Sequence, residues 1–249
     1  MTEGHRNRDD DRVAGRLAPA AVGGRAQTHP DAGAPADIRA RLLAALRTEL
    51  TGPSSDFDGN AIPAATGAAT GAGAADAPVP SWGAVPHPAP RPAGVLAAFR
   101  TDGRLILTKR ASGLRHHPGQ IALPGGKVDP GDADETAAAL REAHEEVGLP
   151  PAQVEVLGTM PGHLTVTGFC MVPVVGLIHG DFTPVPELGE VDEVFEVPFA
   201  HIADPASYRF ERRRWRGDWR SYRVAPWGPY YIWGATARVL HSLALRLSA

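Results

Sequence analysis

The sequence contains a single cysteine, Cys170, among its 249 residues. A chain with one cysteine cannot form an intrachain disulfide bond, and it cannot build a zinc site from several thiolates. Such sparse use of cysteine is typical of proteins that work in a reducing compartment. We therefore expect the protein to be cytoplasmic.

Long apolar runs are missing as well. The longest strongly apolar stretch, MVPVVGLI at residues 171–178, is far shorter than the roughly 20 residues that a membrane-spanning helix needs. The first residues, MTEGHRNRDDDRVAGRLAP, are charged and lack the apolar segment of a secretory signal. The formal net charge of −3 neither demands nor excludes an anionic partner. We expect no contact with a membrane.

Alanine, glycine and proline dominate the first ninety residues. Residues 1–36 show no hydrophobic periodicity and predict a disordered segment, because such a composition cannot offset the entropy of folding. Residues 37–50 place leucines at helical spacing behind Asp37, a candidate N-cap, and predict one amphipathic helix. Residues 51–92 return to a Pro/Gly/Ala-rich composition and predict a linker. We expect the helix to pack on the following domain, and a partner protein is the alternative.

From residue 93 onward the pattern is typical of a folded domain. Residues 94–100 and 104–110 flank the dipeptide Asp102-Gly103, which predicts a β-hairpin. The other expected elements are helices at 134–147 and 232–247 and strands at 153–159, 171–178 and 191–197. This mixture indicates an α/β or α+β sandwich.

The strongest chemical signal is the sequence REAHEE at residues 141–146 of the first of these helices. Positions i, i+3 and i+4 share a helix face, so Glu142, Glu145 and Glu146 are expected to project together. Mg²⁺ commonly combines one or two carboxylates with substrate phosphates. A solvated acidic face is the alternative, but the glycines at 125–126 let the backbone approach a ligand and favour a metal site.

The segment from Gly126 to Leu149 resembles the Nudix box. Its last nine residues, REAHEEVGL, match the pattern Arg-Glu-apolar-x-Glu-Glu-x-Gly-apolar throughout. The front half departs from the common form in two ways. It is one residue longer, and the acid after the loop is Asp132 where the common form has glutamate. The coenzyme A pyrophosphatase branch of the family shows the same insertion. Residues 107–126, LTKRASGLRHHPGQIALPGG, are similar to a second motif of that branch, with Leu123 in a phenylalanine position.

Further resemblance at 166–178, 190–199 and 230–240 extends the match to about residues 94–249. It implies a Nudix fold, in which a mixed β-sheet is sandwiched between α-helices, and a dependence on Mg²⁺ or Mn²⁺. The implied reaction is hydrolysis of coenzyme A or its thioesters to adenosine 3′,5′-bisphosphate and (acyl-)4′-phosphopantetheine. Other Nudix activities, on ADP-ribose, dinucleotides or oxidised nucleoside triphosphates, are alternatives, as is a catalytically silent binding module.

The resemblance also implies roles for individual residues. The expected catalytic residues are Arg141, Glu145, Glu146 and Glu190, and the expected metal ligands are Gly125, through its carbonyl, Glu142, Glu145 and Glu146. Arg141 is expected to neutralise one acid. The general base is left open between a box glutamate and Glu190, for which a surface position is the alternative.

Substrate recognition is assigned to the polar residues that precede the box: Lys109, Arg110, Arg115, His116, His117 and Gln120. The donor fork of arginine suits phosphate, and coenzyme A carries a 3′-phosphate besides its pyrophosphate. Two adjacent histidines would point in different directions on a strand, which argues against a zinc site. An ordinary surface position is the alternative for each residue.

Residues 208–223, YRFERRRWRGDWRSYR, combine seven arginines with five aromatic residues. This composition can stack bases and follow a phosphate backbone. Arg216-Gly217-Asp218 instead predicts the turn of an exposed hairpin, and the total charge is slightly negative. We favour a solvated hairpin over contact with the adenosine end of a substrate, and expect no nucleic-acid partner. A homodimer is left open.

Overall fold

The computed structural model describes residues 37–49, 54–56, 89–215 and 218–249. The predicted disordered segment at 1–36 and most of the predicted linker at 51–92 lie outside these residues. The helices are α1 (Ile38–Arg47), α2 (Glu135–Val147), α3 (Phe199–Ala203) and α4 (Gly234–Ser248). Within the described ranges, no helix is both long and apolar enough to cross a membrane.

The main sheet is mixed and has nine strands. They are β1 (Ser54–Ser55), β2 (Arg91–Arg100), β3 (Arg104–Arg110), β4 (Ile121–Ala122), β5 (Gly125–Lys127), β6 (Val154–Thr159), β7 (His163–Leu164), β8 (Phe169–Ile178) and β9 (Val191–Pro198). Strands β2 and β8 pair in parallel over ten residues, whereas β5 and β3 are antiparallel to β2. Strand β9 pairs with β3, and β6 and β7 pair with β8.

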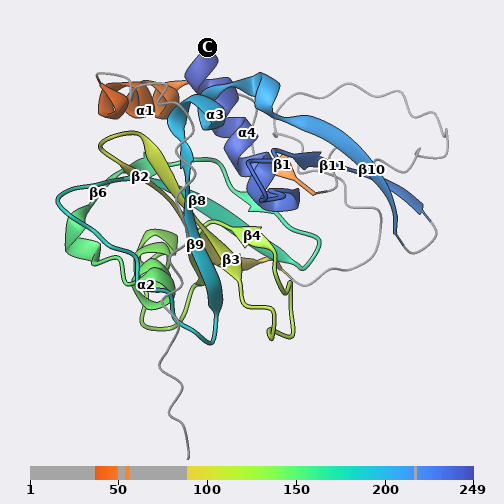
Figure 1. Ribbon diagram of the computed structural model, residues 1–249, viewed down its shortest axis with the longest axis horizontal. Coiled ribbons are helices and arrows are strands. Elements are labelled where there is room, and N and C mark those ends of the chain that lie inside the picture. Colours follow the sequence, from red (N-terminus) through yellow and green to blue (C-terminus); the bar gives the residue numbers. More distant parts are fainter. Residues whose placement is uncertain (1–36, 50–53, 57–88, 216–217) are drawn as a thin grey trace, which may run out of the picture. The chain divides into compact units, whose positions relative to one another are not determined.

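Helices cover both faces of this sheet (Figure 1). Along β2, the side chains of Val95, Ala97 and Phe99 enter one core cluster, and those of Leu96 and Ala98 enter the other. The first cluster contains residues of α1, α3 and α4, and the second contains residues of α2. Because both faces of β2 are buried, its sequence is a nearly continuous apolar run from Ala93 to Phe99. The predicted sheet between helices is confirmed.

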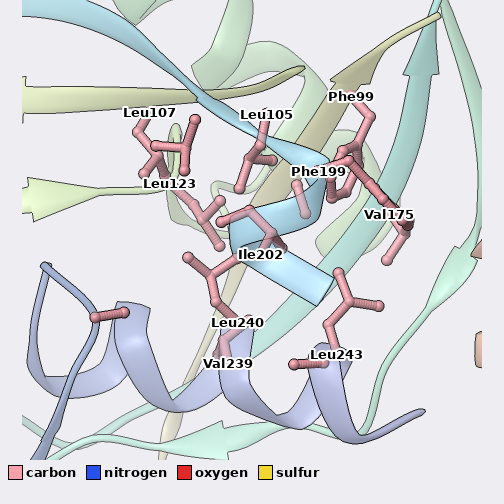
Figure 2. Close-up of a cluster of buried hydrophobic side chains, with 14 of the residues drawn as sticks. Phe99, Leu105, Leu107, Leu123, Val175, Phe199, Ile202, Val239, Leu240 and Leu243 are labelled. Carbon is pink, nitrogen blue, oxygen red and sulfur yellow. The ribbon is translucent and has the colours of Figure 1, made fainter. Parts of the chain in front are cut away.

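The larger cluster joins strands to the C-terminal half of the chain. Figure 2 shows Phe99, Leu105 and Val175 of the sheet together with Ile202 of α3 and Leu243 of α4. The stripe predicted along 232–247 is buried against the sheet, and α4 begins two residues later than predicted and ends one residue later. The hairpin with Asp102-Gly103 as its turn also forms.

Helix α1 packs on α4 and β6, as expected for a helix that docks on its own domain. The Asp37 side chain accepts a hydrogen bond from the Ala40 N–H at 2.8 Å, so the predicted N-cap is present. The helix ends at Arg47, before the predicted residue 50, because Thr48 adopts an extended conformation. The Thr48 carbonyl then accepts a hydrogen bond from Arg246 of α4.

Strand β1 lies inside the segment predicted as a linker. It pairs with β7, and Ser54 Oγ lies 2.8 Å from Nδ1 of the fully buried His163, whose Nε2 lies 3.0 Å from Asp56 Oδ1. Burial would raise the pKa of Asp56, but hydrogen bonds with His163 and the Val166 N–H outweigh burial and hold this pKa below its usual value. Contacts distant in sequence thus order a segment that composition alone marks as flexible.

Residues 208–223 contain the predicted hairpin, made of β10 (Arg209–Trp215) and β11 (Asp218–Val224). Two residues of the predicted turn, at 216–217, lie outside the described ranges. Phe210 and Trp219 are more than half exposed, and the guanidinium of Arg223 lies 3.7 Å from the centre of the Phe210 ring. Arginines and aromatics therefore stack on one another along the hairpin.

We predict that Leu42→Ala lowers the free energy of unfolding by about 2–5 kcal/mol, because the Leu42 side chain is 0% exposed and its removal leaves a cavity. Leu245→Ala is the control, since Leu245 is 42% exposed on α4, and it should change stability by less than about 1 kcal/mol. Urea unfolding measures both. Equal, small effects would show that α1 is not part of the core.

Candidate active site

Helix α2 carries the carboxylates and is fixed at both ends. Its N-cap Asp134 accepts a hydrogen bond from the Ala137 N–H at 2.8 Å, and Gly148 ends it in the left-handed conformation at φ 72°. Ala139, Ala143 and Val147 are fully buried against the sheet. Since these apolar residues occupy one side, the acidic residues face the loop that precedes the helix.

Two glycines allow this loop and helix to approach each other and the sheet. A Cβ atom on Gly94 of β2 would lie 1.8 Å from the Glu135 carbonyl oxygen, so α2 starts in direct contact with β2. A Cβ atom on Gly126 would lie 2.5 Å from the carboxyl carbon of Glu142. Gly126 therefore leaves the space that the Glu142 carboxylate occupies.

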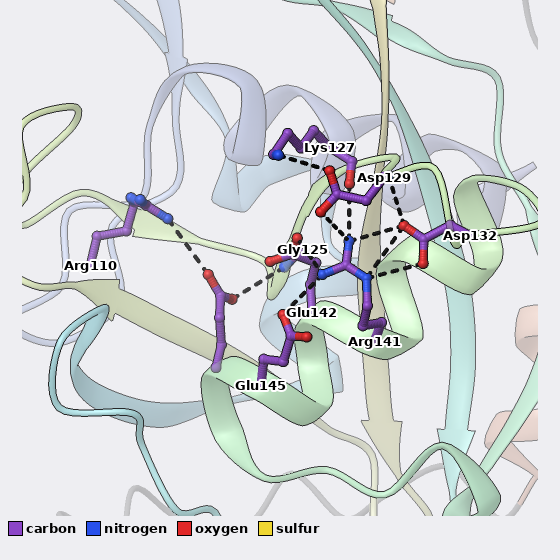
Figure 3. Close-up of polar contacts among 9 residues, drawn as sticks. Arg110, Gly125, Lys127, Asp129, Asp132, Arg141, Glu142 and Glu145 are labelled. Atoms are coloured by element: carbon purple, nitrogen blue, oxygen red, sulfur yellow. Dashed lines mark hydrogen bonds and ion pairs between the residues drawn. The ribbon is translucent and has the colours of Figure 1, made fainter.

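Arg141 connects the loop to the acids of the helix (Figure 3). Its guanidinium donates to Asp132 at 3.0 Å and to the Lys127 carbonyl at 3.2 Å. It also lies 2.9 Å from carboxylate oxygens of both Glu142 and Glu145. The hydrogen bond to Asp132 in turn lowers the pKa of that acid. Arg141 thus neutralises several acids, where the sequence predicted one, and it positions the loop.

Glu146 is the most buried acid of the site, with 3% of its surface exposed. Its carboxylate accepts a hydrogen bond from the Gly125 N–H at 3.2 Å and lies 3.6 Å from the Arg110 guanidinium. Burial raises the pKa of Glu146 to about 7 in spite of these two contacts, and the charges of Glu142 and Glu190 add to the rise. The environment of Glu146 is short of positive charge.

Glu142 shares this imbalance. Burial raises its pKa, Arg141 opposes the rise, and the charges of Glu145 and Glu190 add to it. Glu190 is exposed, and its charge adds to the raised pKa of both Glu142 and Glu146. The turn that carries it is tied to α2, because the Glu190 N–H donates to the Glu187 carbonyl and the Glu187 N–H donates to the Glu146 carbonyl. The Glu145 side chain is 55% exposed and paired with Arg141, so the three box glutamates are not equivalent.

The two buried carboxylates suit a divalent cation. Among the described residues, no three His, Cys, Asp or Glu side chains form a group that could hold a metal ion by themselves. Mg²⁺ does not need such a group, because it uses one or two carboxylates and completes its shell with water and substrate phosphates. Glu142 and Glu146 fit that donor set, and a cation beside them would offset their mutual repulsion.

The predicted substrate residues occupy different places. Arg110 lies beside Glu146, whereas Lys109 lines a pocket of about 280 Å³ with Gly119, Ile121, Pro229, Tyr230, Tyr231 and Trp233. Gln120 lies near Gly234 at the start of α4. Arg115, His116 and His117 are exposed. The histidines lie in the loop between β3 and β4, and the prediction that they lie on a strand is wrong. His117 has a φ of 54°.

The structure adds residues that the sequence argument missed. Asp129 lies 3.7 Å from Arg141 and forms an ion pair with Lys127. The N–H of Glu187 donates to the Glu146 carbonyl at 3.0 Å, which docks the loop before β9 on the end of α2. The turn sequence Asp-Pro-Gly-Asp at 129–132 was the available signal for Asp129, but no local pattern marks Glu187.

Comparison with known proteins agrees with this geometry. The family model described as the NUDIX domain matches residues 88–219, just over half of the 249 residues. The chain belongs to the Nudix family. Two relatives named Uncharacterized Nudix hydrolase NudL, from Enterobacter sp. (strain 638) and Escherichia coli (strain K12), are 44% and 43% identical to it over 148 residues. Each match covers 59% of this chain and 77% of the relative.

Solved Nudix structures are also similar to the chain. A Nudix hydrolase from M. smegmatis, RenU, is 27% identical with a TM-score of 0.35, and the match covers 44% of this chain and 70% of RenU. The NUDIX domain of Shewanella oneidensis NrtR, complexed with ADP ribose, is 21% identical with a TM-score of 0.37. That match covers 47% of this chain and 77% of NrtR's chain. Nudix hydrolases generally use divalent metal ions such as Mg²⁺ or Mn²⁺.

We predict that Glu146→Gln stabilises the metal-free protein at pH 8 and has little effect near pH 4.5. The folded-state pKa of about 7 exceeds the usual 4.5, so between these values the unfolded chain loses the proton first and stability falls as pH rises. Removing the charge should recover up to about 3 kcal/mol above pH 7.

The measurement is urea unfolding in the presence of a chelator at several pH values. Glu145→Gln is the matched control, because the Glu145 side chain is 55% exposed and its carboxylate pairs with Arg141, so removing its charge should not stabilise the protein at pH 8. A Glu146→Gln effect that does not depend on pH would contradict the unfavourable burial of this carboxylate.

Proposed function

We propose that the protein hydrolyses the pyrophosphate bond of coenzyme A or its thioesters, giving adenosine 3′,5′-bisphosphate and (acyl-)4′-phosphopantetheine. The observation that carries this proposal is the contact between Arg110 and Glu146. It joins the segment at 107–126, which resembles the coenzyme A branch, to the carboxylates of the Nudix box. A pyrophosphate placed between them would meet both a cation and a metal site.

Glu142 and Glu146 would hold Mg²⁺ or Mn²⁺, with the Gly125 carbonyl and Glu145, directly or through water, as further ligands. A bound divalent cation polarises phosphoryl oxygens and lowers the pKa of bound water. For the base that accepts the proton of the attacking water, we propose a carboxylate of this cluster: Glu145, Glu146 or Glu190. Arg141 keeps the loop at 126–132 against the helix and so positions these acids.

The cations ahead of the box account for the choice of substrate. Coenzyme A carries a 3′-phosphate that ADP-ribose and most dinucleotides lack, and its recognition requires positive charge away from the pyrophosphate. Arg115 and His117 are exposed in the loop that follows Arg110, and Lys109 lines an aromatic pocket with room for a planar ring. Base-aromatic stacking is worth about 1–3 kcal/mol, so this pocket suits the adenine end.

The first test is direct. Purified protein with Mg²⁺ or Mn²⁺ should convert coenzyme A to the two products, resolved by chromatography, and should act more slowly on dephospho-coenzyme A, ADP-ribose and dinucleotides. Glu146→Gln should reduce turnover by at least about 10²-fold, whereas Glu187→Gln, a change at an exposed acid of the nearby loop, should retain it. Intact coenzyme A at high enzyme concentration would refute the substrate, and retained activity of Glu146→Gln would refute its role.

Gly126→Ala provides an independent test of the site. The added methyl group would lie 2.5 Å from the Glu142 carboxyl carbon, and this flexible side chain can move away at little cost in stability. A displacement of about 1 Å in a catalytic group can cost about 10²-fold in rate, so we expect a large loss of kcat with a nearly unchanged unfolding curve.

Gly131→Ala is the control for that substitution, because a Cβ atom there would meet nothing within 4 Å. It lies in the same loop and should leave both activity and stability unchanged. Equal activity of the two alanine variants would show that the position of the Glu142 carboxylate does not matter for turnover.

A further inference from the structure

An open pocket of about 600 Å³ lies where the C-terminal end of α1, the turn after β6 and the last turn of α4 meet. Among the residues that the structure describes, its lining consists of Leu46, Arg47, Thr48, Glu49, Thr159, Met160, Pro161 and Arg246. Helices α1 and α4 pack on the face of the sheet opposite α2. The pocket is therefore separate from the Nudix box.

Arg246 is the unusual member of this lining. It is 6% exposed, so the side chain is more than nine-tenths buried. It donates a hydrogen bond to the Thr48 carbonyl, and its Nε is buried without a hydrogen-bond partner. Within the part of the chain that the structure describes, no carboxylate forms an ion pair with Arg246. A guanidinium has five N–H donors, and one carbonyl satisfies few of them.

A buried cation without a counter-charge is costly. Buried charges in proteins are normally paired, and an unpaired one costs several kcal/mol. Arg246 lies on the buried side of α4, where Leu243 and Ala244 are also buried. Because Arg246 faces a cavity, an external anion can supply the missing partner.

The other walls define the chemistry of such a ligand. Arg47 adds a second cation, and Thr159 adds an exposed hydroxyl at the opening. Leu46, Met160 and Pro161 provide an apolar wall, which a free inorganic ion would not use. Glu49 is exposed and brings one negative charge to the rim. A volume of this order accommodates a small organic molecule.

We propose that this pocket is a second ligand site, which binds a small organic oxyanion, a phosphate monoester or a carboxylate, through Arg246 and Arg47. The oxyanion pairs with the Arg246 guanidinium where it lines the pocket, and the apolar part of the ligand lies on Leu46 and Met160. Binding joins α1 to α4, so the ligand stabilises the folded chain. The proposal does not depend on the reaction at the Nudix box.

Calorimetric titration of the full chain, stripped of metal ions and dialysed into buffer free of chelator, carboxylate and phosphate, tests the site with three probes: methyl phosphate, butyrate and, as the neutral control, butanol. We expect saturable binding of one of the two anions, with a Kd of about 1 mM or lower, and none of butanol. The anion that binds identifies the ligand class. Glu146→Gln should bind with unchanged affinity, because its change lies at the other site. Loss of binding in Glu146→Gln would place the anion at the Nudix box and refute the proposal.

Two variants locate the site. Arg246→Met removes the cation at similar volume and should weaken binding at least about tenfold, equivalent to 1.4 kcal/mol. Thr159→Trp should close the opening with Arg246 intact, so it tests the site even if Arg246→Met does not fold. Val156→Trp, an exposed position on the same strand outside the pocket lining, is the control. No saturable binding to the wild type up to about 10 mM, or binding unaffected in Thr159→Trp, would overturn the proposal.

Discussion

The parallel pairing of β2 with β8 is the constraint on which the other elements depend. It joins residues 91–100 to residues 169–178 and is buried on both faces by apolar side chains. The second edge of β2 holds β5, and its end leads through a tight turn into β3. Since β5 carries Gly125 and β3 carries Arg110, the two groups described at the Glu146 carboxylate are both held by this pair of strands.

The site follows from where α2 lies on that pair. Gly94 lets the helix start in contact with β2, and the alanines of α2 keep it close along its length. The acids are then held between the helix and the loop at 126–132, where water is partly excluded. Arg141 lies about 3 Å from Asp132, Glu142 and Glu145 and compensates their negative charge. Glu146 has only the more distant Arg110 guanidinium, at 3.6 Å, as a described ion-pair partner. This uneven distribution of charge makes the buried end of the cluster attractive to a divalent cation.

Elements with local signals could be predicted from the sequence. Asp102-Gly103 marks the hairpin, Asp134 and Gly148 mark the ends of α2, and the Nudix box names the acids. Features that depend on distant partners could not be predicted. Strand β1 pairs with β7 and is held by His163, and Glu142 and Glu145 differ in exposure although both lie 2.9 Å from Arg141. The apolar stripe of α4 was visible, but the burial of Arg246 was not, because an arginine in the last turn of an amphipathic helix is usually exposed.

Helices α1 and α4 lie outside residues 88–219, the region matched by the family model. Both supply fully buried residues, Leu42 and Leu240 among them, to the same cluster as the central strands. The part of the chain that packs around this core is therefore larger than the region that the family model matches. Two helices that flank the matched region thus close one face of the sheet. Substitutions in these two helices would alter the stability of that core without any change in the residues of the box.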